Sequence, residues 1–290
     1  MLTFTPTGAA LGSICTGLAG LTTATEADLE EIQAHLRSDL LVVLRGMNQS
    51  TITDFRDFAR RFGELNQYYR PGQWNDPSAP EVLIFSNLPH YGNLAGSGPL
   101  DWHSNNSYCQ RVAQYALLYG VRTPAPERGG ATKFADLQAA YEALDSQVKE
   151  LIDGLEVLRS VKKTIYKYSD LKEAAGDPIP SGIGPLVRQN ERTGRRTLYD
   201  VGATVWVHIL GMSVDDSERL RKQLFEHATQ PRFRYDHRWQ QGDLIIWDNV
   251  STLHGRDGFD AAETRLCWEL DIKDEVATVR PLHSEFGEKV

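Results

Sequence analysis

The hydrophobic pattern near the start of the chain predicts a helix, a buried strand and a second helix. Across residues 26–38 apolar side chains recur every three or four positions, and Thr25 precedes them as a helix cap. Residues 40–44 are apolar throughout, which is typical of a strand buried on both faces. Residues 53–62 carry an aromatic stripe at helical spacing and are followed by Gly63, where the helix should end.

The rest of the chain alternates short apolar runs with turn signals. Two further stretches, 139–154 and 214–229, have a helical pattern. The predicted strands cover residues 81–85, 112–121, 201–210, 242–249 and 265–272. Short strands with helices outside them indicate a mainly β fold with helical decoration (α+β), of the sandwich or jelly-roll kind. We expect a single domain over residues 1–290.

Composition and charge narrow the class of protein. The formal net charge is -8 and no long Lys/Arg run is present, which argues against a nucleic-acid surface. No stretch reaches the ~20 apolar residues of a membrane span, and the N-terminus lacks the pattern of a signal peptide. The three cysteines are widely spaced and form no metal or disulfide motif. We therefore expect a cytoplasmic protein that acts on small molecules, without nucleic acid or membrane partners.

Two histidines carry the chemistry that the sequence suggests. His103 and His254 each lie in a short strand-like context, and Arg265 follows the second by eleven residues. On a strand, positions 103 and 105 would point the same way, so they could contribute two ligands to one metal. Position 105 is Asn105, an amide where an iron centre of this kind usually has a carboxylate.

Several motifs follow one another along nearly the whole chain. They are residues 40–45, Arg61-Phe62-Gly63-Glu64-Leu65, Trp102-His103-Ser104, Gly129-Gly130-Ala131-Thr132, Trp247-Asp248-Asn249, His254 and Arg265. In this order and at this spacing they resemble one known family: the iron(II)- and 2-oxoglutarate-dependent dioxygenases of the taurine dioxygenase type (TauD/TfdA).

The resemblance implies a double-stranded β-helix (jelly roll, cupin-like) and a set of site residues. His103 and His254 would ligate Fe(II), with the third position at Asn105. Arg265 would pair with the distal carboxylate of 2-oxoglutarate, and the hydroxyl of Thr132 would donate to the same group. O2 would be the second cosubstrate. Family members are often dimers or tetramers, so the resemblance leaves room for a homo-oligomer.

The substrate expected from the sequence is a small organic molecule other than taurine. Members that act on taurine have an arginine four residues after the cosubstrate arginine, whereas this chain has Glu269, which would repel a sulfonate. Tyr68, Asn87 and His90 lie in or beside the long polar stretch between residues 70 and 99, where we expect substrate contacts.

Three hypotheses follow. The first is an oxygenase that hydroxylates or desaturates its substrate, with succinate and CO2 released. The second is a ligand-binding member of the same fold that Asn105 has silenced or trapped. The third, a metal-dependent isomerase or hydrolase on a similar barrel, leaves Arg265 and Thr132 without a purpose and ranks last.

Overall fold

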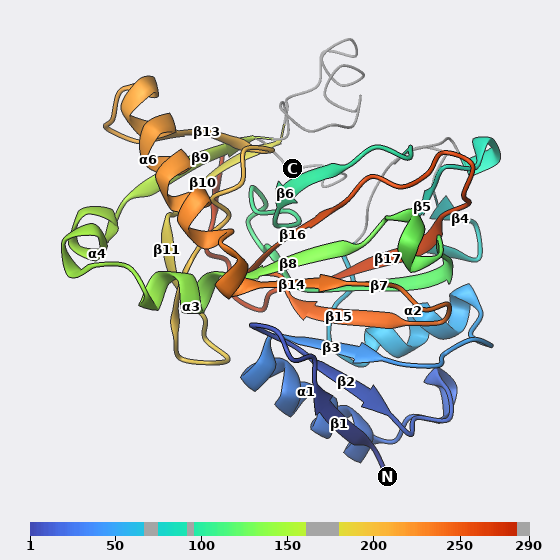
Figure 1. Ribbon diagram of the computed structural model, residues 1–290. Coiled ribbons are helices and arrows are strands. Elements are labelled where there is room, and N and C mark those ends of the chain that lie inside the picture. Colours follow the sequence, from blue (N-terminus) through green and yellow to red (C-terminus); the bar gives the residue numbers. More distant parts are fainter. Residues whose placement is uncertain (67–74, 92–95, 161–179, 283–290) are drawn as a thin grey trace.

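The computed structural model describes residues 1–66, 75–91, 96–160 and 180–282, and two β-sheets form its centre (Figure 1). The larger sheet has eight strands in the order β1-β2-β3-β15-β7-β17-β5-β4, and the smaller has four in the order β14-β8-β16-β6. The larger sheet consists of β1 (Thr3–Pro6), β2 (Ser13–Thr16), β3 (Leu41–Leu44), β15 (Leu244–Asp248), β7 (Ala113–Arg122), β17 (Leu266–Lys273), β5 (Ala79–Ser86) and β4 (Asn75–Asp76). The smaller consists of β14 (Arg234–His237), β8 (Thr132–Asp136), β16 (Thr252–Arg256) and β6 (Leu100–His103).

Strand β15 shows why its sequence is apolar at successive positions. It pairs with β3 on one side and β7 on the other, and all five of its residues are buried. Leu244 and Ile246 belong to the core on the helix side, whereas Ile245 and Trp247 belong to the core between the two sheets. There the ring of Trp247 meets Phe134 of β8, with ring centroids 5.3 Å apart. Alternate side chains of a strand point to opposite faces, so both faces of this strand need apolar residues.

Two helices cover the outer face of the larger sheet. Helix α1 (Glu26–Asp39) and helix α2 (Ile52–Arg60) each begin with a capping box, in which Thr25 pairs with Asp28 and Thr51 with Asp54. The predicted helices and the buried strand between them are confirmed, with ends shifted by one or two residues. The three cysteines are buried.

The remaining helices and strands gather at one end of the two sheets (Figure 1). They are β9 (Glu156–Ser160), β10 (Ser181–Pro185), β11 (Val187–Gln189), β12 (Arg196–Leu198), β13 (Trp206–Ile209), β18 (Arg280–Pro281), α3 (Leu137–Glu142), α4 (Ser146–Ile152) and α6 (Val214–Ala228). Short 3-10 turns cover Leu21–Thr23, Pro89–Tyr91, Pro126–Arg128 and Pro231–Phe233. Among the described residues, no helix is both long and apolar enough to cross a membrane.

At this end of the molecule, one predicted helix and one predicted strand were given the wrong length. The stretch 139–154 is not one helix, because the chain leaves α3 at Ala143 and Asp145 begins α4 in an extended conformation. The stretch 201–210 is a strand only over β13. Before it, Gly202 packs so closely on Trp102 that a Cβ there would lie 2.2 Å from the Trp102 carbonyl oxygen, and the chain bends. The prediction of a mainly β fold of the jelly-roll kind, with helices outside, is confirmed.

Candidate functional site

The two predicted histidines face each other across neighbouring strands of the smaller sheet. His103 ends β6 and pairs directly with His254 of β16 in the antiparallel register. Their ring centroids lie 4.2 Å apart, with 48° between the ring planes. Residues 151 positions apart in the chain therefore present two imidazoles to one side of a cavity.

Both rings are in the form that a metal requires. The Nδ1 atom of His103 lies 2.7 Å from the carbonyl oxygen of Asp101, which can only accept, so Nδ1 carries the proton and Nε2 keeps its lone pair. Burial lowers the pKa of His103, and burial together with the nearby His103 lowers the pKa of His254 well below its usual value. Nδ1 of His254 is buried and has no hydrogen-bond partner within the described chain. Two neutral imidazoles at this distance fit a divalent iron.

The expectation that positions 103 and 105 alternate along one strand was wrong. Strand β6 stops at His103, and Asn105 lies in the turn that follows. Asn249 fixes the backbone of this turn from both sides. Its Oδ1 accepts from the Asn105 N–H at 2.8 Å, and its Nδ2 donates to the Asn105 carbonyl at 3.0 Å. A turn held in this way, rather than strand alternation, brings Asn105 to the cavity that both histidines line.

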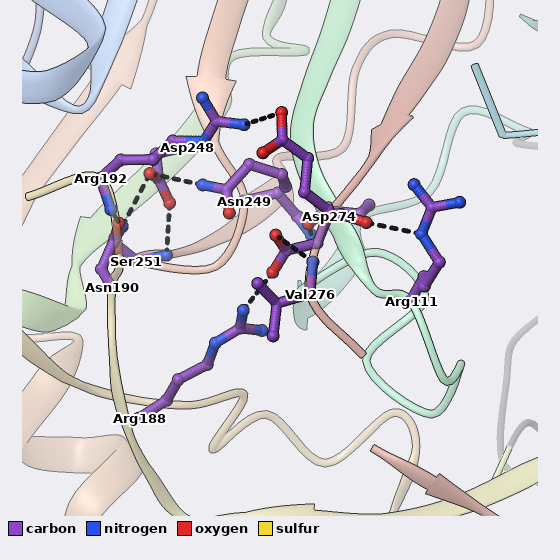
Figure 2. Close-up of polar contacts among 12 residues, drawn as sticks. Arg111, Arg188, Asn190, Arg192, Asp248, Asn249, Ser251, Asp274 and Val276 are labelled. Carbon is purple, nitrogen blue, oxygen red and sulfur yellow. Dashed lines mark hydrogen bonds and ion pairs between the residues drawn. The ribbon is translucent and has the colours of Figure 1, made fainter. Parts of the chain in front are cut away.

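Asn249 is in turn held by a buried polar cluster at the end of β15 (Figure 2). The carboxylate of Asp248 accepts from the Ser251 N–H at 2.8 Å and from Asn190 Nδ2 at 2.8 Å. Gln114 Nε2 donates to the same carboxylate at 2.9 Å. The turn between β15 and β16 therefore has little freedom, and Asn249 reaches Asn105 from a rigid base.

The side chain of Asn105 points its amide nitrogen at two acidic residues of β17. Nδ2 donates to Glu269 Oε1 at 2.8 Å and to Asp271 Oδ1 at 2.9 Å. Asp271 is fully buried, and burial raises the pKa of its carboxyl well above the usual range. In the described part of the chain, no cluster of three or more His, Cys, Asp or Glu side chains could hold a metal.

Arg265 and Thr132 line the same cavity from the two different sheets. Arg265 is only 3% exposed, and among the residues that the structure describes its Nε has no hydrogen-bond partner. No ion pair within the described ranges joins it to a carboxylate; its guanidinium lies over the Trp239 ring, 5.8 Å from the centroid. The Trp239 Nε1–H donates to Thr132 Oγ1 at 3.0 Å. An indole only donates, so the Thr132 hydroxyl proton is left for another acceptor. A buried cation beside a hydroxyl donor fits a carboxylate ligand.

The predicted substrate residues fall into different places. Glu269 lines the cavity. Asn87 does not, because its side chain bonds main-chain groups: Nδ2 donates to the Glu263 carbonyl, and Oδ1 accepts from the Arg265 N–H. His90 is exposed and also lies outside the cavity lining, so the arrangement gives no support for Asn87 or His90 as substrate contacts. Tyr68 lies outside the described residues.

Sequence reasoning missed four residues that shape the site: Trp239, Asn249, Asp271 and Asp200. Asp200 is buried and accepts from the Ser104 N–H at 3.3 Å, next to His103. Asp271 could have been found, because it lies two positions after Glu269 on one predicted strand and so shares its face. The other three are brought in from distant parts of the chain, and no local pattern marks their contacts.

Known proteins resemble this chain in sequence and in fold. The family described as "Taurine catabolism dioxygenase TauD, TfdA family" matches residues 4–270. A pentalenolactone F synthase of Streptomyces arenae is 33% identical over 274 residues, which cover 89% of this chain and 91% of that protein. An alpha-ketoglutarate-dependent 2,4-dichlorophenoxyacetate dioxygenase of Cupriavidus pinatubonensis is 31% identical and covers 82% and 86%.

Solved structures agree with the sequence relatives. A putative alpha-ketoglutarate-dependent taurine dioxygenase from Burkholderia xenovorans superimposes with a TM-score of 0.81 at 26% identity, over 99% of this chain and 96% of that one. AAD-2, in complex with Mn(II) and N-oxalylglycine, superimposes with a TM-score of 0.75 at 25% identity, over 96% and 100%. Fold and relatives define an oxidoreductase of the alpha-ketoglutarate-dependent dioxygenase class. Within that class, the chain belongs to the TauD/TfdA family.

Proposed function

We propose that this protein is an Fe(II)- and 2-oxoglutarate-dependent oxygenase that oxidises a C–H bond of a small organic substrate other than taurine. The observation that carries the proposal is the Arg265 guanidinium, which has no carboxylate partner in the described part of the chain and is buried with the Thr132 hydroxyl in the cavity that both histidines line. A buried cation without a carboxylate is costly, so it indicates an anionic ligand that arrives from outside. A dicarboxylate with one end at Arg265 meets that need.

Each residue of the candidate site would have its own role in this function. His103, His254 and Asn105 would hold the iron, and the proton on His103 Nδ1 keeps Nε2 available to it. Arg265 and Thr132 would bind the distal carboxylate of 2-oxoglutarate and so orient it. When bound, the iron supplies the O2-dependent oxidation. For a hydroxylation, substrate C–H, 2-oxoglutarate and O2 give the alcohol, succinate and CO2. The apolar walls at Leu83 and Leu118 keep water from the site.

Glu269 supports the exclusion of taurine. It lies in the cavity wall and is 9% exposed, so its interactions are weakly screened by solvent. A carboxylate there disfavours a sulfonate and favours a neutral or amine-bearing substrate. The activities named for the relatives, a pentalenolactone F synthase and a 2,4-dichlorophenoxyacetate dioxygenase, belong to those proteins and are only starting points for a substrate screen.

The test is an anaerobic titration of the apoprotein with Fe(II) and 2-oxoglutarate, followed by the visible charge-transfer band of the chelate. We expect a saturable band, and then succinate release on addition of O2 and a substrate from a panel of neutral and amine-bearing compounds. His254→Ala should lose the band while its circular dichroism spectrum stays unchanged.

The competing hypothesis, a silenced protein that binds a ligand without turnover, rests on the neutral amide of Asn105. A protein that shows no band and no succinate release, yet is stabilised by 2-oxoglutarate against thermal unfolding, would support that hypothesis and contradict an oxygenase.

A further inference from the structure

Asn105 is surrounded on its nitrogen side by acidic groups that are themselves fixed in the larger sheet. Glu269 and Asp271 are two residues apart on β17, so their side chains leave the same face of the strand. Asn105 Nδ2 donates one hydrogen to each, at 2.8 and 2.9 Å. The neighbouring Asn106 donates from Nδ2 to the other oxygen of Asp271 at 2.7 Å.

This arrangement decides which way the Asn105 amide points. An amide has two N–H donors on one side and only an acceptor on the other. Facing two carboxylates, the nitrogen gains two hydrogen bonds, whereas the oxygen would meet two acceptors and gain none. Oδ1 of Asn105 takes part in no hydrogen bond among the described residues, and the residue lines the cavity. The oxygen is thus the side-chain atom that Asn105 offers to a metal.

We propose that Glu269 and Asp271 are positioning residues for the iron site, which accept both hydrogens of the Asn105 amide and so lock it with Oδ1 forward. The inference rests on the proposed function. In this chain the carboxyl groups near the ligand position lie one layer behind residue 105, on β17. Asn105, Glu269 and Asp271 therefore act as one unit that we name the carboxylate clasp.

The clasp predicts that restoring a carboxylate at position 105 does not simply repair the metal site. An aspartate at position 105 would place a third carboxylate within hydrogen-bonding distance of Glu269 and Asp271, in a buried setting. An aspartate has no N–H to donate, so residue 105 would lose both hydrogen bonds and present acceptor oxygens to the oxygens of Glu269 and Asp271. Asn105→Asp should therefore destabilise the protein, and replacement of one clasp carboxyl by an amide in Asp271→Asn should reverse part of the effect. The double variant exchanges amide and carboxyl group between positions 105 and 271 and so restores the hydrogen bond between them, but not the one to Glu269.

The experiment is a double-mutant cycle read in two ways: the melting temperature of the metal-free protein, and the affinity for Co(II), titrated into the apoprotein and followed by its visible absorption. Asn105→Asp should lower the melting temperature by roughly 5–10 °C, and the exchange variant should recover part of that loss. Asp271→Asn alone should weaken Co(II) binding at least about tenfold, because an amide at 271 cannot accept from both Asn105 and Asn106 and the orientation of Asn105 is lost, while the exchange variant regains the affinity.

A matched control lies outside the cavity. Asn190 donates to buried Asp248 at 2.8 Å, which is the same kind of contact (Figure 2). Asn190→Asp should also lower the melting temperature, but Asp271→Asn should not restore it. This separates the specific coupling of the clasp from the general effect of an added buried carboxylate.

The outcomes are distinguishable. Additive effects of Asn105→Asp and Asp271→Asn on the melting temperature, in a protein that binds Co(II), would overturn the clasp and leave the proposed function standing. Strong coupling in a protein that binds no Co(II) would overturn both the proposed function and the role of the clasp at a metal. Coupling together with restored Co(II) affinity in the exchange variant would support both.

Discussion

Arg265 offers the sharpest test of how this site is built, because its buried charge should lower the stability of the protein when no 2-oxoglutarate is bound. We consider Arg265→Met, which keeps the aliphatic stem and removes the charge. The guanidinium is 3% exposed and has no carboxylate partner within the described chain. Its one favourable contact of note is with the Trp239 ring at 5.8 Å, worth about 1 kcal/mol.

The balance of these terms gives a magnitude. Relief of an unpaired buried charge exceeds the lost cation–π contact, which leaves a net gain of about 1–3 kcal/mol for the empty protein. The melting temperature should rise by roughly 2–8 °C. In contrast, 2-oxoglutarate at about one hundred times its Kd stabilises the wild-type protein by ~2.7 kcal/mol. The variant should lose nearly all of this stabilisation, because the charge that binds the distal carboxylate is gone.

The assay is thermal unfolding in the absence of O2, with Mn(II) alone and with Mn(II) plus 2-oxoglutarate. Arg159→Met is the control. Arg159 is also fully buried, but it donates to the main-chain carbonyls of Gly184, Pro185 and Tyr199. Its loss leaves these acceptors unpaired and should reduce stability by about 2–4 kcal/mol, with the 2-oxoglutarate shift intact. If Arg265→Met behaved like this control, the assignment of Arg265 to the cosubstrate would be refuted.

Three further predictions test the surroundings of the site. Trp239→Phe removes the N–H that donates to Thr132 but keeps an aromatic ring. The affinity for 2-oxoglutarate, measured by calorimetry with Mn(II), should fall severalfold. An unchanged affinity would contradict a role of Trp239 in positioning Thr132. Burial lowers the pKa of His237, so below about pH 6.5 the unfolded chain takes up a proton that the folded protein does not. This residue should therefore lower the free energy of unfolding on acidification, by at most about 1.4 kcal/mol per pH unit. His237→Gln should show a shallower fall in urea unfolding between about pH 6.5 and 5, and an identical slope would show that the residue plays no part. Asn249→Ala removes both side-chain bonds to the Asn105 backbone and should weaken Co(II) binding about tenfold or more without loss of fold, whereas wild-type affinity would show that the turn holds itself.

Much of the fold followed from local pattern. The helical spacing and caps before α1 and α2 predicted both helices, and the apolar run before Arg45 predicted β3. Where a prediction from local pattern was wrong, as for the strand over residues 201–210, tertiary contacts determined the conformation. The bend before β13 depends on a neighbour distant in the chain, the carbonyl of Trp102 against Gly202.

The candidate site divides in the same way. The sequence alone determined which side chains could do the chemistry: two histidines, an amide in place of a carboxylate, a hydroxyl and an arginine in a recognisable order. It also identified Glu269 as a departure with consequences for the substrate. These inferences need only residue type and spacing along the chain, because the chemical properties of a side chain belong to the residue itself.

Only the tertiary structure decided what these side chains meet. Strand pairing set His103 opposite His254, and the turn held by Asn249 brought Asn105 against Glu269 and Asp271. None of these distances is encoded locally, since each joins segments more than a hundred residues apart. Hydrogen bonds and charges act over a few ångströms of space, so the orientation of an amide or the pairing of a buried cation is settled only when the sheets have closed around it.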